Sequence, residues 1–329
     1  MPMEKRVYFR FVQYEKGIRQ MKQKLDFTKT GTLTLTALFC CFLWGSAFPS
    51  IKIGYSLFGI AGSDTSSQIL FAGTRFFIAG LLAILFGSLI KGRLLLPKKS
   101  SLVKIFILSL VQTVLQYVFF YIGLAHTSGV KASIIEATNV FAALIVSAIF
   151  FKETLSSKKI FGCIIGFIGI VIINLNGAGF SFAFTAEGEG AIALSAIMYA
   201  VSSALIKSFS KDEDPFSLAG YQFLVGGLVM MLIGKSLGGI VSGFTPKSTA
   251  LLIYMGFISA AAYSLWALLL RDNPISRVTI FGFTNPMFGV LLSALLLGEK
   301  NQAFTLRGLI SLIFVCTGIL IVNAPAKQK

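Results

Sequence analysis

Charged residues are scarce in this sequence of 329 amino acids: Asp, Glu, Lys and Arg together make up 13% of it. A soluble globular protein carries about 25% charged residues, because a surface that faces water needs charge. Hydrophobic residues make up 55% of the chain. The composition therefore excludes a soluble fold of this length and indicates a membrane protein, since surface that faces lipid must be apolar.

Residues that hold metals, form disulfides or perform catalysis are also few. The chain has one His and four Cys, and none of the cysteines has the spacing of zinc ligands. An intramembrane hydrolase needs paired acids or a Ser–His constellation at depth, and the sequence supplies neither. We expect no metal site, no cofactor and no enzymatic activity. We interpret the four cysteines as apolar packing residues: Cys40, Cys41, Cys163 and Cys316.

Motifs for nucleotide hydrolysis and for ion channels are missing from the sequence. The glycine-rich stretch at 234–243 lacks the Lys-Ser/Thr ending of a phosphate-binding loop. Nothing resembles the repeated charged ring or the carbonyl filter of a channel. The sequence therefore carries no signature of ATP-driven activity or of a channel.

Long apolar runs dominate what is present. A spanning helix needs about 20 apolar residues, and we predict an all-α membrane protein with ten transmembrane helices. The fifth run is the shortest and spans the bilayer if its polar flanks reach the interfaces. The runs are Leu33–Leu57, Ser67–Ile90, Leu102–Ala125, Val130–Phe151, Ile160–Ile173, Gly190–Phe209, Phe216–Ile233, Thr249–Leu270, Ile275–Leu297 and Phe304–Val322.

The net charge of +16 is distributed as a membrane topology requires and forms no single patch for nucleic acid. Lys and Arg gather in the N-terminal tail and in alternate loops, while the loops at 59–66 and 175–188 carry none. The positive-inside rule then places both termini in the cytoplasm. We expect no nucleic-acid partner and a multi-pass protein of the plasma (inner) membrane.

The basic tail at 1–30 precedes the first span. Apolar residues recur there at alternating spacings of four and three, which is typical of one helical face: Val7, Phe11, Tyr14, Ile18, Met21 and Leu25. Two interpretations remain open. The tail is either an interfacial helix on the anionic cytoplasmic leaflet, or a disordered basic extension, with Met21 as an alternative initiator.

An internal repeat divides the rest of the chain into two five-span domains, 31–175 and 188–324. NVFAALIVSAIFFKE at 139–153 matches NPMFGVLLSALLLGE at 285–299, and AGTRF at 72–76 matches AGYQF at 219–223. The closing segments GIVIIN and GILIVN also match, at 169–174 and 318–323. Further pairs are Tyr117 with Tyr263, Lys52 with Lys207, and Glu153 with Glu299.

Five is an odd number, so the second repeat enters the membrane inverted relative to the first. Inverted repeats are a device of secondary transporters, because two pseudo-symmetric halves can expose one central site to either side in turn. Simple duplication without alternating access is the alternative.

These residues resemble a known family. The first span carries FLWGSAFPSIK at 42–52, and the fourth and ninth spans close on KE at 152–153 and GEK at 298–300. With the five-plus-five repeat, the chain resembles the drug/metabolite transporter superfamily in its EamA-type ten-helix branch. The resemblance implies transport of amino acids, amines or related metabolites, commonly outward. The second repeat departs from the first-span motif, with Tyr199, Ala200 and Val201 in place of Trp-Gly-Ser.

Two charged residues lie inside predicted spans, where a charge is costly and needs a reason. Arg75 and Glu136 fall at similar depths, roughly 10–12 Å below the same surface at 1.5 Å per residue. One interpretation places Glu136 in a central cavity as a cation partner or proton carrier. The other makes Arg75–Glu136 a structural ion pair that orders the bundle. Lys52 lies nearer the outer interface, where we expect its side chain to reach toward water.

Polar and aromatic residues at comparable depth complete the predicted site. Gln112 and Gln116 are four apart, while Glu136 and Asn139, like Tyr263 and Trp266, are three apart, so each pair shares a helical face. With Arg75 and Glu136, the candidates for binding substrate or lining a pore are Trp44, Ser46, Gln112, Gln116, Tyr117, Asn139, Tyr199, Tyr263, Trp266 and Asn285.

The sequence thus predicts a secondary transporter, and more specifically an exporter, that carries small metabolites such as amino acids or amines by alternating access. Its partners would be the small-molecule substrate, the lipid bilayer and a coupling proton or other ion. The alternative is a non-transporting membrane sensor or assembly protein that retains the transporter fold.

Overall fold

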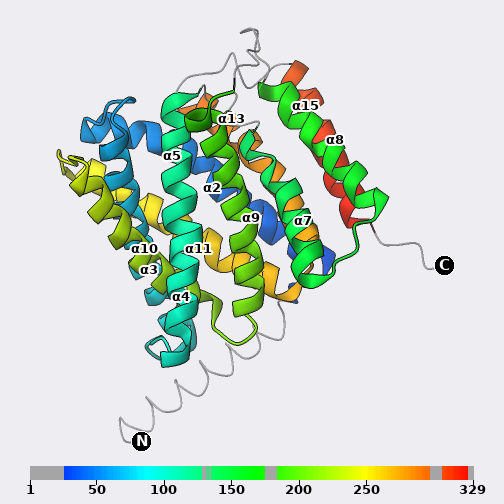
Figure 1. Ribbon diagram of the computed structural model, residues 1–329, viewed down its shortest axis with the longest axis horizontal. Helices are drawn as coiled ribbons and strands as arrows, with labels where there is room; N and C mark the ends of the chain where they lie inside the picture. The colour runs from blue at the N-terminus through cyan, green and yellow to red at the C-terminus, as the bar shows by residue number, and fades with distance from the viewer. Residues whose placement is uncertain (1–25, 128–131, 133–134, 175–183, 297–305, 325–329) are drawn as a thin grey trace, which may run out of the picture.

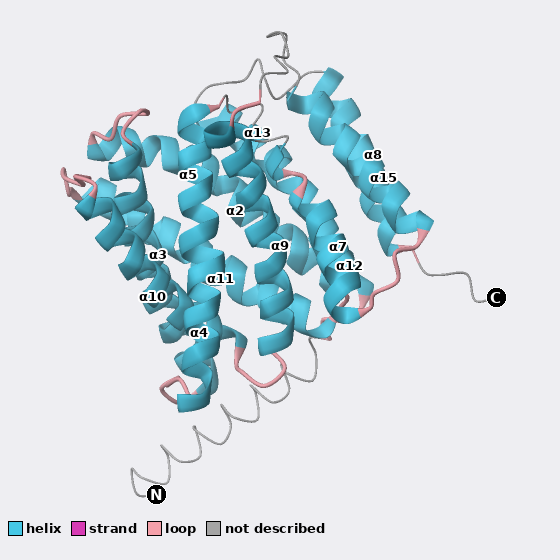
Figure 2. Cartoon of the chain, in the orientation of Figure 1, coloured by secondary structure: helices cyan, strands magenta, loops and turns pink. Residues whose placement is uncertain are grey.

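The computed structural model describes residues 26–127, 132, 135–174, 184–296 and 306–324, and within these ranges it contains helices and no strand. The helices stand side by side in one bundle (Figures 1 and 2). The expected tail helix before residue 26 and Glu299 lie outside these ranges. The helices are α2 (Thr30–Phe58), α3 (Thr65–Lys91), α4 (Leu102–Leu108), α5 (Gln116–His126), α7 (Asn139–Phe151), α8 (Ser157–Asn174), α9 (Ala191–Phe209), α10 (Pro215–Ser236), α11 (Pro246–Asp272), α12 (Ile275–Thr279), α13 (Thr284–Leu296) and α15 (Leu306–Asn323).

Seven helical segments of the described chain are long and apolar enough to cross a membrane. They are Thr30–Phe58, Thr65–Lys91, Lys99–Leu124, Ala186–Phe209, Pro215–Ser236, Pro246–Asp272 and Ile275–Leu296. Two shorter apolar helices, Asn139–Phe151 and Gly308–Asn323, accompany them. The protein is therefore a multi-pass membrane protein.

Local sequence signals fix where the helices begin and end. Asp64 accepts a hydrogen bond from the backbone of Ser67 and caps α3, as side-chain oxygens at this position do. Asp214 caps α10 in the same way, with Pro215 as the first helical residue. Glycines in the left-handed region end α2 and α3, at Gly59 and Gly92.

Three helical segments change their hydrogen-bonding pattern in the middle of the bundle. A π-helical segment, Ser109–Leu115, joins α4 to α5, and a 3₁₀ turn, Ile280–Phe283, joins α12 to α13. Residues 137 and 138 form a turn immediately before α7. Irregular backbone at membrane depth is tolerated only where protein buries it or a cavity borders it. These breaks are therefore candidate positions for a binding cavity.

Glycines bring α3 and α10 into close antiparallel contact. A Cβ added to Gly73 would lie 2.9 Å from Gly227 O, and a Cβ added to Gly80 would lie 2.7 Å from Gly220 O. The residue number rises along α3 as it falls along α10, so the two helices run in opposite directions. Small residues allow this approach of two backbones, which replaces hydrophobic association between helices in lipid.

The same arrangement recurs between α8 and α15, which lie side by side in Figure 1. Gly162 meets Gly318 O at 3.0 Å, and Gly169 meets Ser311 O at 2.9 Å, when a Cβ is placed on each. Ser311 Oγ donates a hydrogen bond to Gly169 O at 2.7 Å. The GxxxG element at 162–166 is therefore a site of close helix packing.

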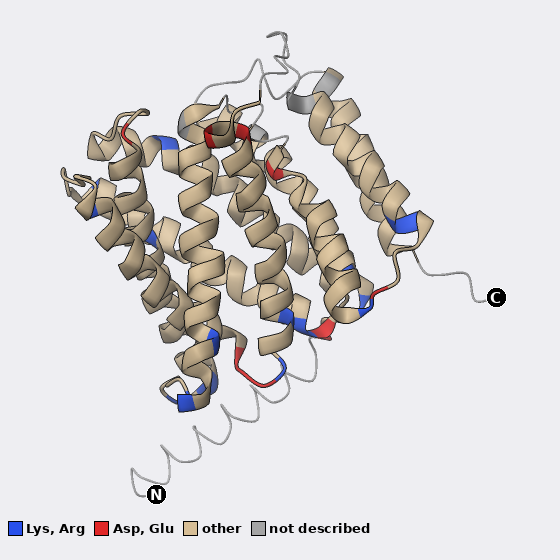
Figure 3. Cartoon of the chain, in the orientation of Figure 1, with Lys and Arg blue, Asp and Glu red and all other residues tan. Residues whose placement is uncertain are grey.

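Most cations of the described chain lie at one end of the bundle, which we call the basic end; the opposite end is the far end (Figure 3). The basic end contains the turn between α3 and α4 and the turn between α9 and α10. Among its cations are Lys91, Lys98, Lys211 and Arg271. The helix α2 begins at the basic end, so the first described residues lie there (Figure 1).

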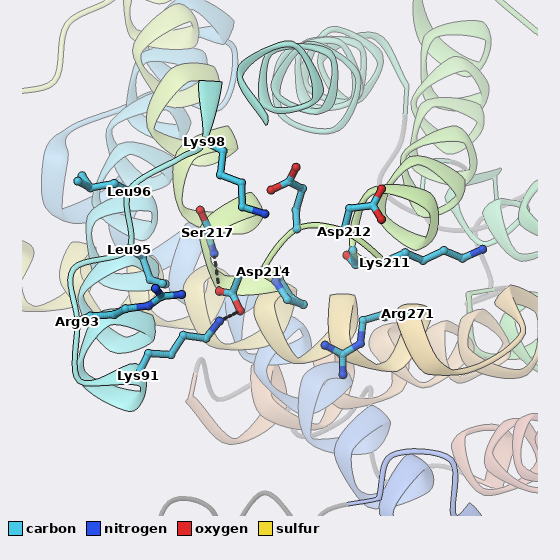
Figure 4. A pocket seen from close by; sticks show the side chains of 13 residues that line it. Lys91, Arg93, Leu95, Leu96, Lys98, Lys211, Asp212, Asp214, Ser217 and Arg271 are labelled. Atoms are coloured by element: carbon cyan, nitrogen blue, oxygen red, sulfur yellow. Dashed lines mark hydrogen bonds and ion pairs between the residues drawn. The ribbon is translucent and has the colours of Figure 1, made fainter. Parts of the chain in front are cut away.

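Ion pairs join the two turns of the basic end across a pocket of about 310 Å³ (Figure 4). Lys91 pairs with Asp214, and Lys104 Nζ lies 3.3 Å from Glu213 Oε1. Ser101 Oγ donates to Glu213 Oε2 at 2.6 Å. Burial raises the pKa of Glu213, but the hydrogen bonds from Ser101 and Lys104 and the Lys104 charge outweigh it, so the pKa lies below its ordinary value.

A Gly73→Ala substitution should destabilise the protein, because the new Cβ would lie 2.6 Å from Met231 N. Overpacking of this kind costs about 1–3 kcal/mol, which a lower melting temperature in detergent would reveal. The control is Gly31→Ala in α2, where a Cβ meets nothing within 4 Å. That variant should melt at or slightly above the wild-type temperature, and equal losses in the two variants would contradict the close contact.

Glu213→Gln should lower the melting temperature at neutral pH, because it removes a carboxylate that Lys104 and Ser101 stabilise. A carboxylate whose folded pKa is depressed contributes stability that is lost as the pH falls through that pKa. The gap in melting temperature between wild type and variant should therefore narrow as the pH falls below the ordinary pKa of a Glu side chain and close below the depressed pKa of Glu213. Asp212→Asn is the control, since Asp212 is 75% exposed and exposed pairs contribute little. A gap that persists in acid would count against this role of Glu213.

Candidate functional site

A cavity of about 420 Å³ lies where the broken helical segments meet. The helices α2, α3, α5, α9 and α11 line it, together with the first residues of α7 and α13 and the turns before these two helices. Its walls run from the middle of α2, at Trp44, to Tyr55 near the far end of that helix. The cavity therefore extends from the middle of the bundle toward the far end.

Nine of the twelve residues that the sequence singles out line this cavity. Three of the twelve lie elsewhere: Ser46 donates to Leu43 O at 2.7 Å and contacts Tyr254, Gln112 belongs to a network nearer the basic end, and Trp266 packs behind Trp44. The nine are Trp44, Arg75, Gln116, Tyr117, Glu136, Asn139, Tyr199, Tyr263 and Asn285.

Buried polar atoms without a hydrogen-bond partner converge on the cavity. Within the described chain nine buried side-chain nitrogen or oxygen atoms have no partner, and five of them belong to residues that line it. Such atoms are rare and need an explanation. Two are donors and three are acceptors: Trp44 Nε1 and Arg75 Nε, against Gln116 Oε1, Glu136 Oε2 and Asn285 Oδ1.

Arg75 and Glu136 share the cavity wall without pairing. No ion pair within 4.0 Å joins them, although both lie in the described part of the chain. The Arg75 guanidinium instead lies over the ring of Phe76, 4.4 Å from its centroid, and 5.8 Å from that of Tyr117. Such cation–π contacts stabilise a cation but leave its hydrogen-bond donors available. Arg75 Nε and Glu136 Oε2 thus remain without a protein partner at the cavity wall.

Aromatic rings form the floor of the cavity on the side of the basic end. Tyr117 and Tyr263 share a hydrogen bond of 2.7 Å between their hydroxyls. Trp44 makes edge contacts with Tyr263 and Trp266, at centroid separations of 5.1 and 4.9 Å. These rings therefore pack against one another where the lining of the cavity begins on α2, at Trp44.

A polar network lies beneath this floor and joins the π-helical segment to α9 and α10. Thr113 Oγ1 donates to Gln222 Oε1 at 2.7 Å, and Gln222 Nε2 donates to Gln112 Oε1 at 3.0 Å. Gln112 Nε2 donates in turn to Ser202 Oγ at 3.4 Å. All four side chains are buried, so the network closes the bundle on this side with its polar groups paired.

Sequence reasoning missed part of the α2 wall. Lys52, which we expected at the interface, lines the cavity, and so do Phe48, Ile51 and Tyr55. Trp44, Phe48, Ile51 and Tyr55 follow one another at spacings of four, three and four, which is the pattern of one helical face. That periodicity was the available signal. Gln222, the repeat counterpart of Arg75, was missed because a neutral amide in an apolar run costs less than a charge and is therefore a weaker signal of a functional site.

Comparison with known proteins gives a consistent result. The model of the EamA-like transporter family matches residues 32–175 and 187–324. An uncharacterized transporter of Archaeoglobus fulgidus is 28% identical, over 88% of this chain and 96% of its own length. The uncharacterized transporter YvbV of Bacillus subtilis is 26% identical, over 92% of this chain and 94% of its own. A WAT1-related chloroplastic protein of Arabidopsis thaliana is 24% identical, over 86% and 67%.

A solved crystal structure shares the fold. It superposes with a TM-score of 0.75 over 90% of this chain and 97% of the other, at 16% sequence identity. The family match covers far more than half of the sequence, in a protein whose helices are apolar and long enough to span a bilayer. The chain therefore belongs to the EamA-like transporter family.

Proposed function

We propose that this protein is a secondary transporter that exports small zwitterionic metabolites, of the size and character of apolar amino acids, across the plasma membrane. Two inverted five-helix repeats, ten spans in all, would alternate the access of the central cavity. The observation that carries the proposal is the set of unpartnered donors and acceptors around that cavity.

The unpartnered atoms define the cargo by complementarity. Arg75 Nε and Trp44 Nε1 need acceptors, which a carboxylate offers. Glu136 Oε2, Gln116 Oε1 and Asn285 Oδ1 need donors, which an ammonium group offers. Both signs of charge occur on one wall, so a zwitterion fits better than a simple amine. The apolar and aromatic rest of the wall would hold an apolar side chain.

The helix contacts support the inverted repeat. By the match of 72–76 with 219–223, Gly73 corresponds to Gly220 and Gly80 to Gly227. The contact of Gly73 with Gly227 is then the counterpart of the contact of Gly80 with Gly220, and both are present. Antiparallel helices that exchange contacts in this way are related by a two-fold axis perpendicular to them, which is the symmetry of an inverted repeat.

The charge distribution supports the orientation. Cations gather at the basic end (Figure 3), so that end would face the cytoplasm and carry both termini. The cavity would then open toward the outside, with the aromatic floor and the Gln222 network closed toward the cytoplasm. No nucleotide-binding motif is evident in the sequence, and coupling to a proton or other ion gradient would supply the energy.

A non-transporting sensor with the same fold is the alternative. It would bind a ligand in the cavity and transmit that event without turnover. Saturable flux of a bound ligand into proteoliposomes distinguishes the two, because only a transporter produces it.

Ligand-induced thermal stabilisation should identify the cargo, since a ligand that binds the folded state raises its melting temperature with concentration. We expect apolar amino acids to stabilise the wild type and their amides, which lack the carboxylate, to stabilise it less. Glu136→Gln should weaken binding at least about tenfold, because a charge-assisted hydrogen bond is lost.

Glu187→Gln is the matched control, since the Glu187 side chain is 79% exposed and does not line the cavity; it should bind like the wild type. Flux that survives Glu136→Gln with unchanged rate and pH dependence would refute the role of Glu136. A panel of amino acids, amines and nucleosides without any hit would refute the zwitterion.

A further inference from the structure

Two helix interfaces in the bundle are counterparts under the repeat, and they differ. One joins α10 to the segment between α4 and α5; the other joins α3 to α11. The repeat matches pair Arg75 with Gln222, Ala79 with Gly226, and Thr113 with Ser259. Every contact at one interface therefore has an expected counterpart at the other, and a contact without its counterpart marks a difference between the halves.

The interface nearer the basic end is closed. Gly226 packs so tightly on Thr113 that an added Cβ would lie 2.5 Å from Thr113 Cβ. Thr113 Oγ1 donates to Gln222 Oε1 at 2.7 Å. Thr113 and Gln222 are 0% and 1% exposed, so both members of this hydrogen bond are sealed from either surface.

The counterpart interface is open by one helical turn. Its expected contacts are Ala79 with Ser259 and Arg75 with Ser259. Instead an added Cβ on Gly256 would lie 2.7 Å from Ile78 Cγ2 and 3.3 Å from Ala79 N. The partner of Ala79 is thus displaced by three residues along α11, which is about 4.5 Å. Arg75 and Ser259 both line the cavity, and no hydrogen bond joins them in the described chain.

Contacts between exact counterparts lie on the pseudo-two-fold axis and are compatible with both arrangements. Phe76 stacks on its counterpart Phe223 at 5.2 Å, with ring planes 11° apart. Tyr117 bonds its counterpart Tyr263. An exchange of the two interfaces therefore leaves these contacts in place, and the helices have a fixed axis about which to move.

We propose that the far end closes when α11 slides one turn along α3 and brings Ser259 opposite Arg75, and that Arg75 makes this closure depend on an anionic group. Gln222 closes the basic end as a neutral amide, whereas Arg75 carries a permanent charge. A hydroxyl cannot neutralise that charge, and Glu136 shares the cavity wall without pairing with Arg75. Sealing a cation without a paired anion in a membrane interior is costly. The carboxylate of a cargo would compensate it, so the empty protein would not cycle. The cargo part of this inference rests on the proposed function; the slide does not.

Repeat counterparts also supply the reporters for a test. Ala47 lines the open cavity, and its counterpart Ser202 is 0% exposed in the closed network. A single cysteine is introduced at one of these positions, and the protein is alkylated in detergent by a water-soluble maleimide. The protein without the introduced cysteine gives the background rate. In the wild type, Ala47→Cys should react quickly and Ser202→Cys slowly.

Arg75→Gln removes the charge and makes residue 75 identical to its repeat counterpart, Gln222. Ser259→Asp places an anion opposite Arg75 in the closed state. Each should raise the alkylation rate of Ser202→Cys at least about tenfold and lower that of Ala47→Cys, since each removes the cost of burying an uncompensated charge. Lys235→Gln is the control: it removes an exposed cation from the last turn of α10, outside the cavity, and should leave both rates unchanged.

Wild-type rates in Arg75→Gln, with an unchanged melting temperature, would refute the charge dependence. A shift in Arg75→Gln without one in Ser259→Asp would refute Ser259 as the partner, and an equal shift in Lys235→Gln would refute the specific role of Arg75. Alkylation needs no cargo. A protein that shifts as expected but shows no flux would contradict the proposed function and leave this inference standing.

Discussion

The contact between α3 and α10 is the constraint on which the rest of the structure depends. In a bilayer the association of helices gains little from hydrophobic burial, so it relies on close packing and on paired polar groups. Glycines at 73, 80, 220 and 227 allow two backbones to approach closely enough to provide that packing. Phe76 and Phe223 stack beside this contact and lead directly to the floor of the cavity.

The cavity and the closed network beneath it follow from this contact between α3 and α10. On the side of the basic end, polar side chains satisfy one another, and the bundle is sealed. On the side of the far end, side chains of the same kind remain without partners and face open space. A single arrangement of helices thus presents one paired and one unpaired version of related surfaces.

Much of this could be predicted from the sequence, because lipid imposes strong rules. Apolar run lengths predicted where the helices lie, and depth arithmetic predicted a similar depth for Arg75, Gln116 and Glu136, which all line the cavity in the structure. The same arithmetic did not reveal that Arg75 and Glu136 remain apart, because depth along the membrane normal says nothing about rotation of a helix about its axis. Gln112 was expected at the cavity because it shares a helical face with Gln116, but it lies one turn nearer the basic end, in the network below the cavity. Lys52 was missed because reaching toward water and lining an open cavity look alike in a sequence.

The difference between Arg75 and Gln222 bears on which of two conformations a protein built from two related halves prefers at rest. Two identical repeats would give two conformations of equal energy, and the protein would rest in each of them half of the time. Every substitution that distinguishes the halves lifts this degeneracy and biases the population toward one state. A guanidinium in one repeat and an amide in the other is one such difference, beside the Phe76–Phe223 contact. Under the proposed alternating access, the divergence between the two halves would therefore set the resting orientation of the protein.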